Sequence, residues 1–151
     1  MTVVDGHNLY HALDRVDEEH FERGLDLLVA DMRRMVCKGR VLLVLDGSGG
    51  GNPRGSEKNL SEHLRVVYSG SISADDWIER WELRHHLPAW SLVSGDRRMY
   101  ERLKRKGVQL CDPKAWFTSL QRTRNLLTPS EKLQNGKKSF GSTEEWLDYF
   151  S

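Results

Sequence analysis

The sequence predicts an α/β fold built around a mainly parallel sheet. Short apolar runs rich in β-branched residues alternate with longer segments of helical periodicity, an order typical of βαβ units. The run at 41–45 (Val-Leu-Leu-Val-Leu) is apolar throughout, which predicts a strand buried on both faces of a parallel sheet. The chain has 151 residues, of which 38% are hydrophobic and 30% charged, enough for one domain with a single core.

The first half of the chain contains three expected strands and one long helix. Val3 and Val4 form a very short first strand that ends at Asp5. Apolar residues then recur at helical spacing over 21–36, and Gly39 ends that helix. The buried strand at 41–45 follows, and 64–68 reads as the third strand.

The second half continues the alternation. Ala74, Trp77, Ile78 and Trp81 fall on one face of a helix that begins at Ser73. A strand at 90–93 precedes a helix over 97–106, with Gly107 at its C-terminal end. A last strand at 108–111 leads to Asp112 and Pro113, a favourable start for a final helix.

Two segments do not fit the alternation. Residues 47–63 open with a glycine-rich stretch and are expected to form a long flexible connection, either a mobile flap over a substrate or a plain connector. This stretch lacks the third glycine of a dinucleotide fingerprint, and Ser56-Glu57 stands where a P-loop requires Lys-Ser/Thr. A nucleotide-binding loop is therefore not predicted.

The second such segment is the polar C-terminal tail, residues 126–151. Capping-box patterns at 128–131 and 142–145 predict two short helices. The last of these either closes the core or docks on a protein or ribonucleoprotein partner. The expected domains are therefore a single folded domain over 1–125 and the tail over 126–151.

Composition excludes several classes of protein. No apolar run approaches the ~20 residues that span a bilayer, and no secretory leader pattern follows Met1, so no membrane association is expected. Cys37 and Cys111 are too few and too far apart for a zinc site or a disulfide framework. A cytoplasmic location is expected. The net charge of +1 excludes a polybasic binder.

Aspartates follow the predicted strands at several exits. In an open parallel sheet, ligands bind outside the carboxyl ends of the strands. Asp5 ends the first strand, Asp46 ends the second, and Asp96 follows the strand at 90–93. Asp75 and Asp76 open the helix after the strand at 64–68. Five carboxylates are thus expected on one rim.

Such a cluster requires protons or a cation. Two like charges ~4 Å apart repel by about 4 kcal/mol at an effective dielectric constant of about 20. Oxygen-only ligands in a hydrated cleft favour Mg²⁺ or Mn²⁺ over Zn²⁺. A cation held in this way can activate a water and neutralise a phosphoryl transition state.

Basic residues surround the predicted rim. When the five aspartates are set aside from the 22 acids, 17 acids remain against 23 bases. The bases lie mainly in the helix after Asp96 and in the glycine-rich segment. They are Arg97, Arg98, Arg102, Lys104, Arg105, Lys106, Arg54 and Lys58. An acidic pit in a basic surround suits a phosphodiester polymer.

Each residue also has a simpler interpretation. Asp96 can cap the helix that it precedes, and Asp76, the third residue after Ser73, can be a capping-box acid. Asp46 followed by Gly47 is a common turn at a strand exit. The arginine-rich helix can be a solvated face. The joint arrangement at separate strand exits and helix starts favours the functional interpretation.

Four motifs resemble the NYN domain of the PIN-like nuclease superfamily, in its YacP-like branch. They are Val4-Asp5-Gly6-His7-Asn8, Val44-Leu45-Asp46, Ser73-Ala74-Asp75-Asp76-Trp77-Ile78-Glu79 and Val93-Ser94-Gly95-Asp96-Arg97. The similarity runs in order from about residue 2 to residue 125. His7 replaces the aromatic residue common at that place, and Arg98 stands where many NYN proteins carry another acid.

The resemblance implies a Rossmann-like PIN-type three-layer fold and divalent-metal-dependent endoribonuclease activity. Asp5, Asp75 and Asp96 would be the core catalytic and metal-site acids, with Asp46 a fourth metal ligand. Asn8 would orient Asp5 or a substrate phosphate. The substrate would be RNA, expected to be single-stranded, with Arg54, Lys58, Arg97, Arg98 and Arg102 as substrate-binding residues.

Two other functions compete with this hypothesis. A non-catalytic RNA-binding module on the same fold would use the basic helix without a metal, although an idle cluster of like charges would only destabilise it. A phosphatase of the aspartyl-phosphate type would require a second acid two residues after Asp46, where Ser48 stands.

Overall fold

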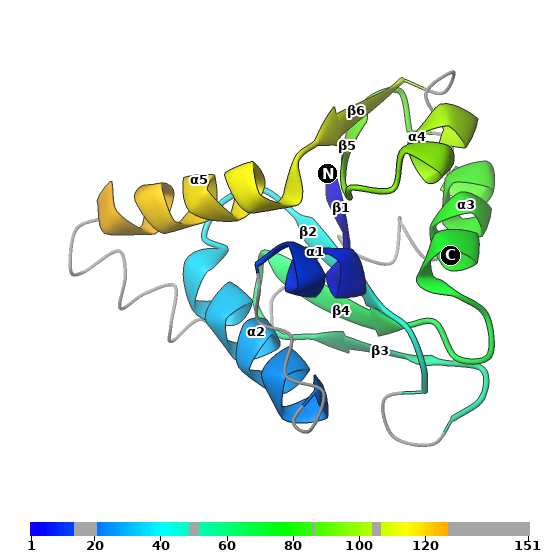
Figure 1. The fold of residues 1–151 in the computed structure, drawn as a ribbon, viewed down its shortest axis with the longest axis horizontal. Coiled ribbons are helices and arrows are strands. Elements are labelled where there is room, and N and C mark those ends of the chain that lie inside the picture. The colour runs from blue at the N-terminus through cyan, green and yellow to red at the C-terminus, as the bar shows by residue number, and fades with distance from the viewer. Residues whose placement is uncertain (14–20, 49–51, 86, 104–106, 127–151) are drawn as a thin grey trace.

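A computed structural model describes residues 1–13, 21–48, 52–85, 87–103 and 107–126. They form a six-stranded sheet with helices on both faces (Figure 1). The strands are β1 (Thr2–Asp5), β2 (Val41–Leu45), β3 (Ser56–Asn59), β4 (Leu64–Tyr68), β5 (Trp90–Val93) and β6 (Val108–Cys111). The helices are α1 (Gly6–Ala12), α2 (Phe21–Met35), α3 (Ala74–His85), α4 (Arg97–Leu103) and α5 (Pro113–Leu126).

The sheet is parallel except at one edge. Its strand order is β3-β4-β2-β1-β5-β6, and only β3 runs antiparallel to its neighbour. The order reverses direction around β1, because β2 and β4 lie on one side of β1 whereas β5 and β6 lie on the other. Clefts form at the carboxyl ends of strands at such a switch point.

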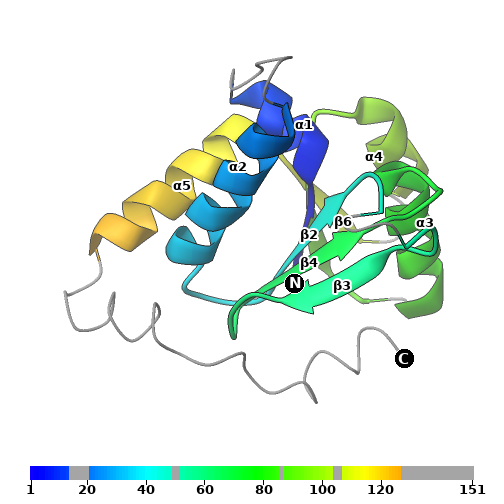
Figure 2. The same ribbon diagram turned by 90° about the horizontal axis from the view of Figure 1, so that it is seen from below.

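Helices cover both faces of the sheet, so the predicted three-layer α/β fold is confirmed. On one face α1, α2 and α5 pack on the sheet through Leu9, Leu28 and Phe117, all buried. On the other face α3 and α4 contribute Trp81 and Met99 to a second buried cluster. Figure 2 shows the two groups of helices on opposite sides of the strands.

Helix α1 was not expected from the sequence. Its seven residues, Gly-His-Asn-Leu-Tyr-His-Ala, are too few to display helical periodicity, and only three are buried. Gly6 allows the helix to begin directly after β1. A Cβ atom at this position would lie 2.3 Å from Leu45 Cδ2 and 3.0 Å from the carbonyl oxygen of Val44. Glycine therefore lets α1 approach β2 closely.

The prediction of a connection throughout 47–63 was wrong for part of its length, because β3 lies within it. The four residues of β3 are polar, and their backbones pair with β4 from Ser56 opposite Tyr68 to Asn59 opposite Arg65. An edge strand of this kind is held by backbone hydrogen bonds and shows no apolar alternation. Charged residues at such an edge also oppose pairing with another chain.

Several predictions lie outside the described residues. These are the structure of 49–51 within the glycine-rich stretch, Lys104, Arg105 and Lys106, and both helices expected in the tail. The boundary at residue 125 stays a prediction. Cys37 and Cys111 are both free thiols, as expected. Within the described ranges, no helix is long and apolar enough to cross a membrane.

Candidate active site

Asp5 occupies the centre of the carboxyl edge of the sheet. It is the last residue of β1 and the N-cap of α1, where its Oδ1 accepts a hydrogen bond of 3.3 Å from the backbone N–H of Asn8. Only 6% of Asp5 is exposed. A carboxylate is therefore held in an almost dry position at the start of a short helix.

Asp75 brings the carboxylates together. It lies in the first turn of α3, and its side chain contacts the carboxyl groups of both Asp5 and Asp96 through hydrogen bonds. Its neighbour Asp76 is exposed, and the backbone N–H of Asp76 donates a 3.1 Å hydrogen bond to Ser73 Oγ. The structure thus places the Asp75 side chain in the cluster, whereas Asp76 takes part in the helix cap through its backbone.

Asp96 combines two roles that the sequence left as alternatives. Its Oδ1 caps α4, accepting hydrogen bonds from the backbone N–H groups of Arg98 at 2.9 Å and Met99 at 3.2 Å. The same side chain contacts Asp75. Ser94 Oγ accepts a 3.0 Å hydrogen bond from the Asp96 backbone N–H and so fixes the loop between β5 and α4.

The electrostatics of the three acids differ. Burial, together with the charges of Asp75 and Asp46, raises the pKa of Asp5 to about 7, although the Asn8 N–H opposes this. Burial and the contact with Asp96 raise the pKa of Asp75. The pKa of Asp96 is lowered overall: slight burial opposes this, but the hydrogen bonds from the N–H groups of Met99 and Arg98 outweigh the effect of burial. Of the three acids, Asp5 and Asp75 therefore bind a proton more readily than Asp96.

Asp46 lies close to the cluster, but its oxygens are engaged elsewhere. Oδ1 accepts a 2.6 Å hydrogen bond from the backbone N–H of Ala74, and Oδ2 lies 3.3 Å from His7 Nδ1. The charge of Asp46 still contributes to the raised pKa values of Asp5 and Asp75. In this structure Asp46 therefore links the start of α3 to α1.

Two features of the site were missed in the sequence. His7 makes two contacts with Asp46. Its Nδ1 lies 3.3 Å from Asp46 Oδ2, and the backbone N–H of Asp46 donates a 3.2 Å hydrogen bond to the same Nδ1. Burial lowers the pKa of His7. Asn8 Oδ1 accepts a 2.6 Å hydrogen bond from the Gly95 N–H, which connects α1 to the loop that carries Asp96. Only the positions of His7 and Asn8, two and three residues after Asp5, could have signalled these contacts.

The predicted basic residues are distributed unevenly around the carboxylates. Arg97 and Arg98 are exposed in the first turn of α4, beside Asp96. Arg102 contacts Glu79 of α3 and interacts with the charges of Asp96 and Asp75. Arg54 is exposed just before β3, whose first residue pairs with the last residue of β4, so it stays near the carboxyl edge.

Lys58 is further from this edge than the other bases. It lies opposite Val66, in the middle of β4, and no described contact joins it to the carboxylates. Lys58 and the arginines stay predicted substrate-binding residues. Their arrangement places Arg97, Arg98 and Arg102 beside the carboxylates and Lys58 at the far edge strand.

The donor atoms of the cluster suit a hard cation, although they are not arranged around one. Asp5, Asp75 and Asp96 offer only carboxylate oxygens, the ligands that Mg²⁺ and Mn²⁺ prefer. In the part of the chain that the structure describes, no group of three or more His, Cys, Asp or Glu side chains could hold a metal ion as placed. The carboxyl group of Asp75 instead contacts those of Asp5 and Asp96.

Comparisons with known proteins agree with this fold. The family model described as the YacP-like NYN domain matches residues 2–148. The crystal structure of Rae1 (YacP) from Bacillus subtilis, as a W164L mutant, is similar with a TM-score of 0.61 and 19% sequence identity. That match covers 98% of this chain and 91% of the other. At this identity the likeness concerns the fold. No curated protein matches the chain.

Proposed function

The chain belongs to the YacP-like NYN domain family, and from that premise we propose that it is a divalent-metal-dependent endoribonuclease. The family match supports a nuclease-type function in general. The finer proposal is that an aspartate cluster hydrolyses phosphodiester bonds in RNA. Asp5, Asp75 and Asp96 would be its catalytic acids.

The observation that carries the proposal is the direct contact among three carboxyl groups at the switch point of the sheet. Asp75 from α3 bridges Asp5 from β1 and Asp96 from the loop before α4. Burying and grouping the acids in this way raises the pKa values of Asp5 and Asp75, so their carboxyl groups ionise less readily in the folded protein. Retaining such an arrangement without a cation would only destabilise the fold.

The carboxylates Asp5, Asp75 and Asp96 would hold the ion, Mg²⁺ or Mn²⁺, once they release their shared protons. Asp46 is the further candidate ligand, and it would have to exchange its bond to Ala74 or its contact with His7 for one to the ion. A bound divalent cation supplies an activated water and neutralises charge on the phosphate.

The remaining residues of the site would orient these groups and the substrate. Asn8 holds Asp5 through its backbone N–H and holds the Asp96 loop through its side chain, so it fixes two of the three acids relative to each other. Arg97 and Arg98 are exposed next to Asp96, where they can meet an approaching phosphate. Arg102 would be available only in competition with Glu79.

The partner proposed for this site is RNA, in single-stranded form. A protein or ribonucleoprotein partner that binds the tail, and a cytoplasmic location, stay predictions from the sequence. Family membership supports a nuclease-type function, and RNA is the substrate class proposed on that basis.

Cleavage of end-labelled single-stranded RNA in Mg²⁺, in Mn²⁺ or in EDTA tests the proposal. We expect cleavage with either metal and none in EDTA. Asp75→Asn should reduce the rate at least a hundredfold. Asp76→Asn, the matched control from the adjacent position, should keep most of the activity, because its backbone N–H still bonds to Ser73 Oγ. It should cost at most ~1 kcal/mol of stability through the lost negative charge in the first turn of α3.

Two outcomes would contradict the proposal. Binding of RNA without cleavage in either metal would favour the non-catalytic RNA-binding module. Loss of activity in Asp76→Asn with full activity in Asp75→Asn would mean that the functional acid of α3 had been assigned one residue out of register.

A further inference from the structure

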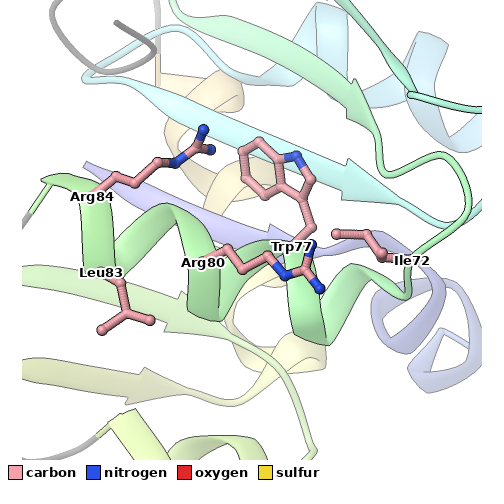
Figure 3. A pocket seen from close by; sticks show the side chains of 5 residues that line it. All are labelled: Ile72, Trp77, Arg80, Leu83 and Arg84. Carbon is pink, nitrogen blue, oxygen red and sulfur yellow. The ribbon is translucent and has the colours of Figure 1, made fainter.

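A groove along the outer side of α3 combines an indole with two arginines. It has a volume of about 440 Å³ and is lined by Ile72, Trp77, Arg80, Leu83 and Arg84. Figure 3 shows the indole of Trp77 with the guanidinium group of Arg84 on one side and that of Arg80 on the other. We call this the α3 groove.

Helical spacing explains why these side chains meet. Trp77, Arg80 and Arg84 are separated by three and four residues, so they lie on one stripe of α3. The adjacent side of the helix, with Ile78 and Trp81, is fully buried against the sheet. Trp77 is half-buried against the same core cluster, which holds its ring in place beside the groove.

Among the described residues, no ion pair balances the charge of the groove. Arg80 and Arg84 are both exposed, and neither forms an ion pair with a residue in the described ranges. Other arginines differ in this respect, since Arg65 pairs with Glu57 at 3.1 Å and Arg102 contacts Glu79. Two guanidinium groups that form no ion pair within the described ranges, beside an aromatic ring, attract an anion that also carries a flat apolar surface.

The α3 groove and the carboxylate cluster share the N-terminal part of α3 but lie on different sides of that helix. Asp75 precedes Trp77 by only two residues in the same helix. Arg84 lies seven residues beyond Trp77, which is about 10 Å along the axis at about 1.5 Å per residue. Because Asp75 and Trp77 point about 200° apart, a strand whose phosphate reaches Asp75 would pass around the N-terminal end of α3, at Ile72, to Trp77 and then towards Arg84.

From these features we infer that the α3 groove binds the single-stranded segment of RNA flanking the phosphate at the carboxylate cluster. One base stacks on Trp77, and Arg80 and Arg84 bind phosphates of the same strand. Stacking on an aromatic ring tolerates every base, because each has a π-face. Bases inside a duplex have no free face for the indole, so the groove selects single strands. The inference rests on the proposed function for its substrate class.

Binding of fluorescein-labelled oligouridylate to the full chain, measured by anisotropy in EDTA over a salt series, tests the arginines. Arg80→Gln/Arg84→Gln should raise Kd about tenfold and reduce the log–log salt slope by about 1.4, at about 0.7 per phosphate contact on single strands. The matched control is Lys114→Gln/Arg122→Gln, which removes two exposed charges from α5 on the other face. It should leave the slope unchanged.

The aromatic contact has a different signature. Trp77→Leu keeps an apolar side chain against the core but cannot stack, so Kd should rise about tenfold with no change in the salt slope. Trp77→Phe should recover most of the affinity. Melting curves establish that each variant is folded. A duplex of the same length should bind the wild type and the two Trp77 variants equally.

The inference is overturned if the double arginine variant keeps the wild-type Kd and slope, or if the α5 control shows the same loss. It is also overturned if the arginine variant loses affinity only for a peptide with the acidic and aromatic sequence of residues 142–151. Because EDTA prevents metal-dependent cleavage, groove-dependent binding by a chain that never cleaves RNA would refute the nuclease and retain the groove. Metal-dependent cleavage together with unaltered RNA binding in all variants would refute the groove and retain the nuclease.

Discussion

Replacing Asp5 with Asn should stabilise the metal-free protein at neutral pH. Asp5 is 6% exposed, and burial together with the charges of Asp75 and Asp46 raises its pKa from 3.8 to about 7. Between these two pH values the folded chain holds a proton that the unfolded chain has lost. The free energy of unfolding therefore falls as pH rises from about 4 to about 7, and the loss is complete above pH 7.

The size of this effect follows from the shift. A difference of about three pH units corresponds to about 4 kcal/mol at about 1.36 kcal/mol per unit. Asn carries no charge to bury, and its side-chain oxygen can still accept the hydrogen bond from the Asn8 N–H. At pH 7.5 Asp5→Asn should exceed the wild type in stability by up to about 4 kcal/mol. Near pH 4 the difference should disappear.

Urea unfolding in EDTA at several values between pH 4 and pH 8 measures this difference directly. Asp112→Asn is the matched control, because Asp112 is an exposed aspartate whose Oδ2 caps α5 through a 2.9 Å hydrogen bond from the Ala115 N–H. Its stability relative to the wild type should not follow the same pH dependence. If Asp5→Asn is less stable than the wild type at pH 7.5, or if the difference is constant with pH, Asp5 is a structural acceptor and the reasoning fails.

Two further predictions concern the surroundings of the cluster. Arg98→Glu/Arg102→Glu should weaken RNA binding and flatten its salt dependence. Metal affinity should stay nearly unchanged, because these side chains lie beside Asp96 without holding the ion. Unchanged RNA binding over a salt series would show that α4 is only a solvated helix. Asn8→Ala should cost about 1 kcal/mol in urea unfolding and a larger factor in cleavage rate, because it removes the 2.6 Å bond that ties α1 to the Asp96 loop. Equal activity in Asn8→Ala and wild type would show that this bond does not position the acids.

Hydrophobic pattern was sufficient to predict most of the fold. The apolar run 41–45 is fully buried in β2, as expected for a central parallel strand, and the amphipathic pattern from Phe21 became α2. Patterns fail where an element is too short or too polar to have one. Helix α1 has seven residues, and β3 is a polar edge strand that pairs through its backbone.

For the candidate site, the sequence placed the acids but not their bonds. Strand exits and helix starts converge at one edge in a parallel sheet, so the proximity of Asp5, Asp75 and Asp96 was predictable. The bond from the Ala74 N–H to Asp46 joins residues 28 positions apart, and no local rule specifies it. The α3 groove was overlooked because the sequence pattern grouped Trp77 with Ile78 and Trp81 on one helix face, whereas its ring also lines the surface.

The chemical nature of the RNA ends after cleavage tests the central claim most directly. If the carboxylate cluster supports attack by water on the phosphorus, each cut leaves a 5′-phosphate on the downstream fragment, and cutting stops in EDTA. These ends can be identified by their sensitivity to a 5′-phosphate-dependent exonuclease and by mass spectrometry. Fragments that end in a 2′,3′-cyclic phosphate would show that the ribose 2′-hydroxyl is the nucleophile. Cleavage that continues undiminished in EDTA would show that no divalent metal is required, and either result would contradict the account.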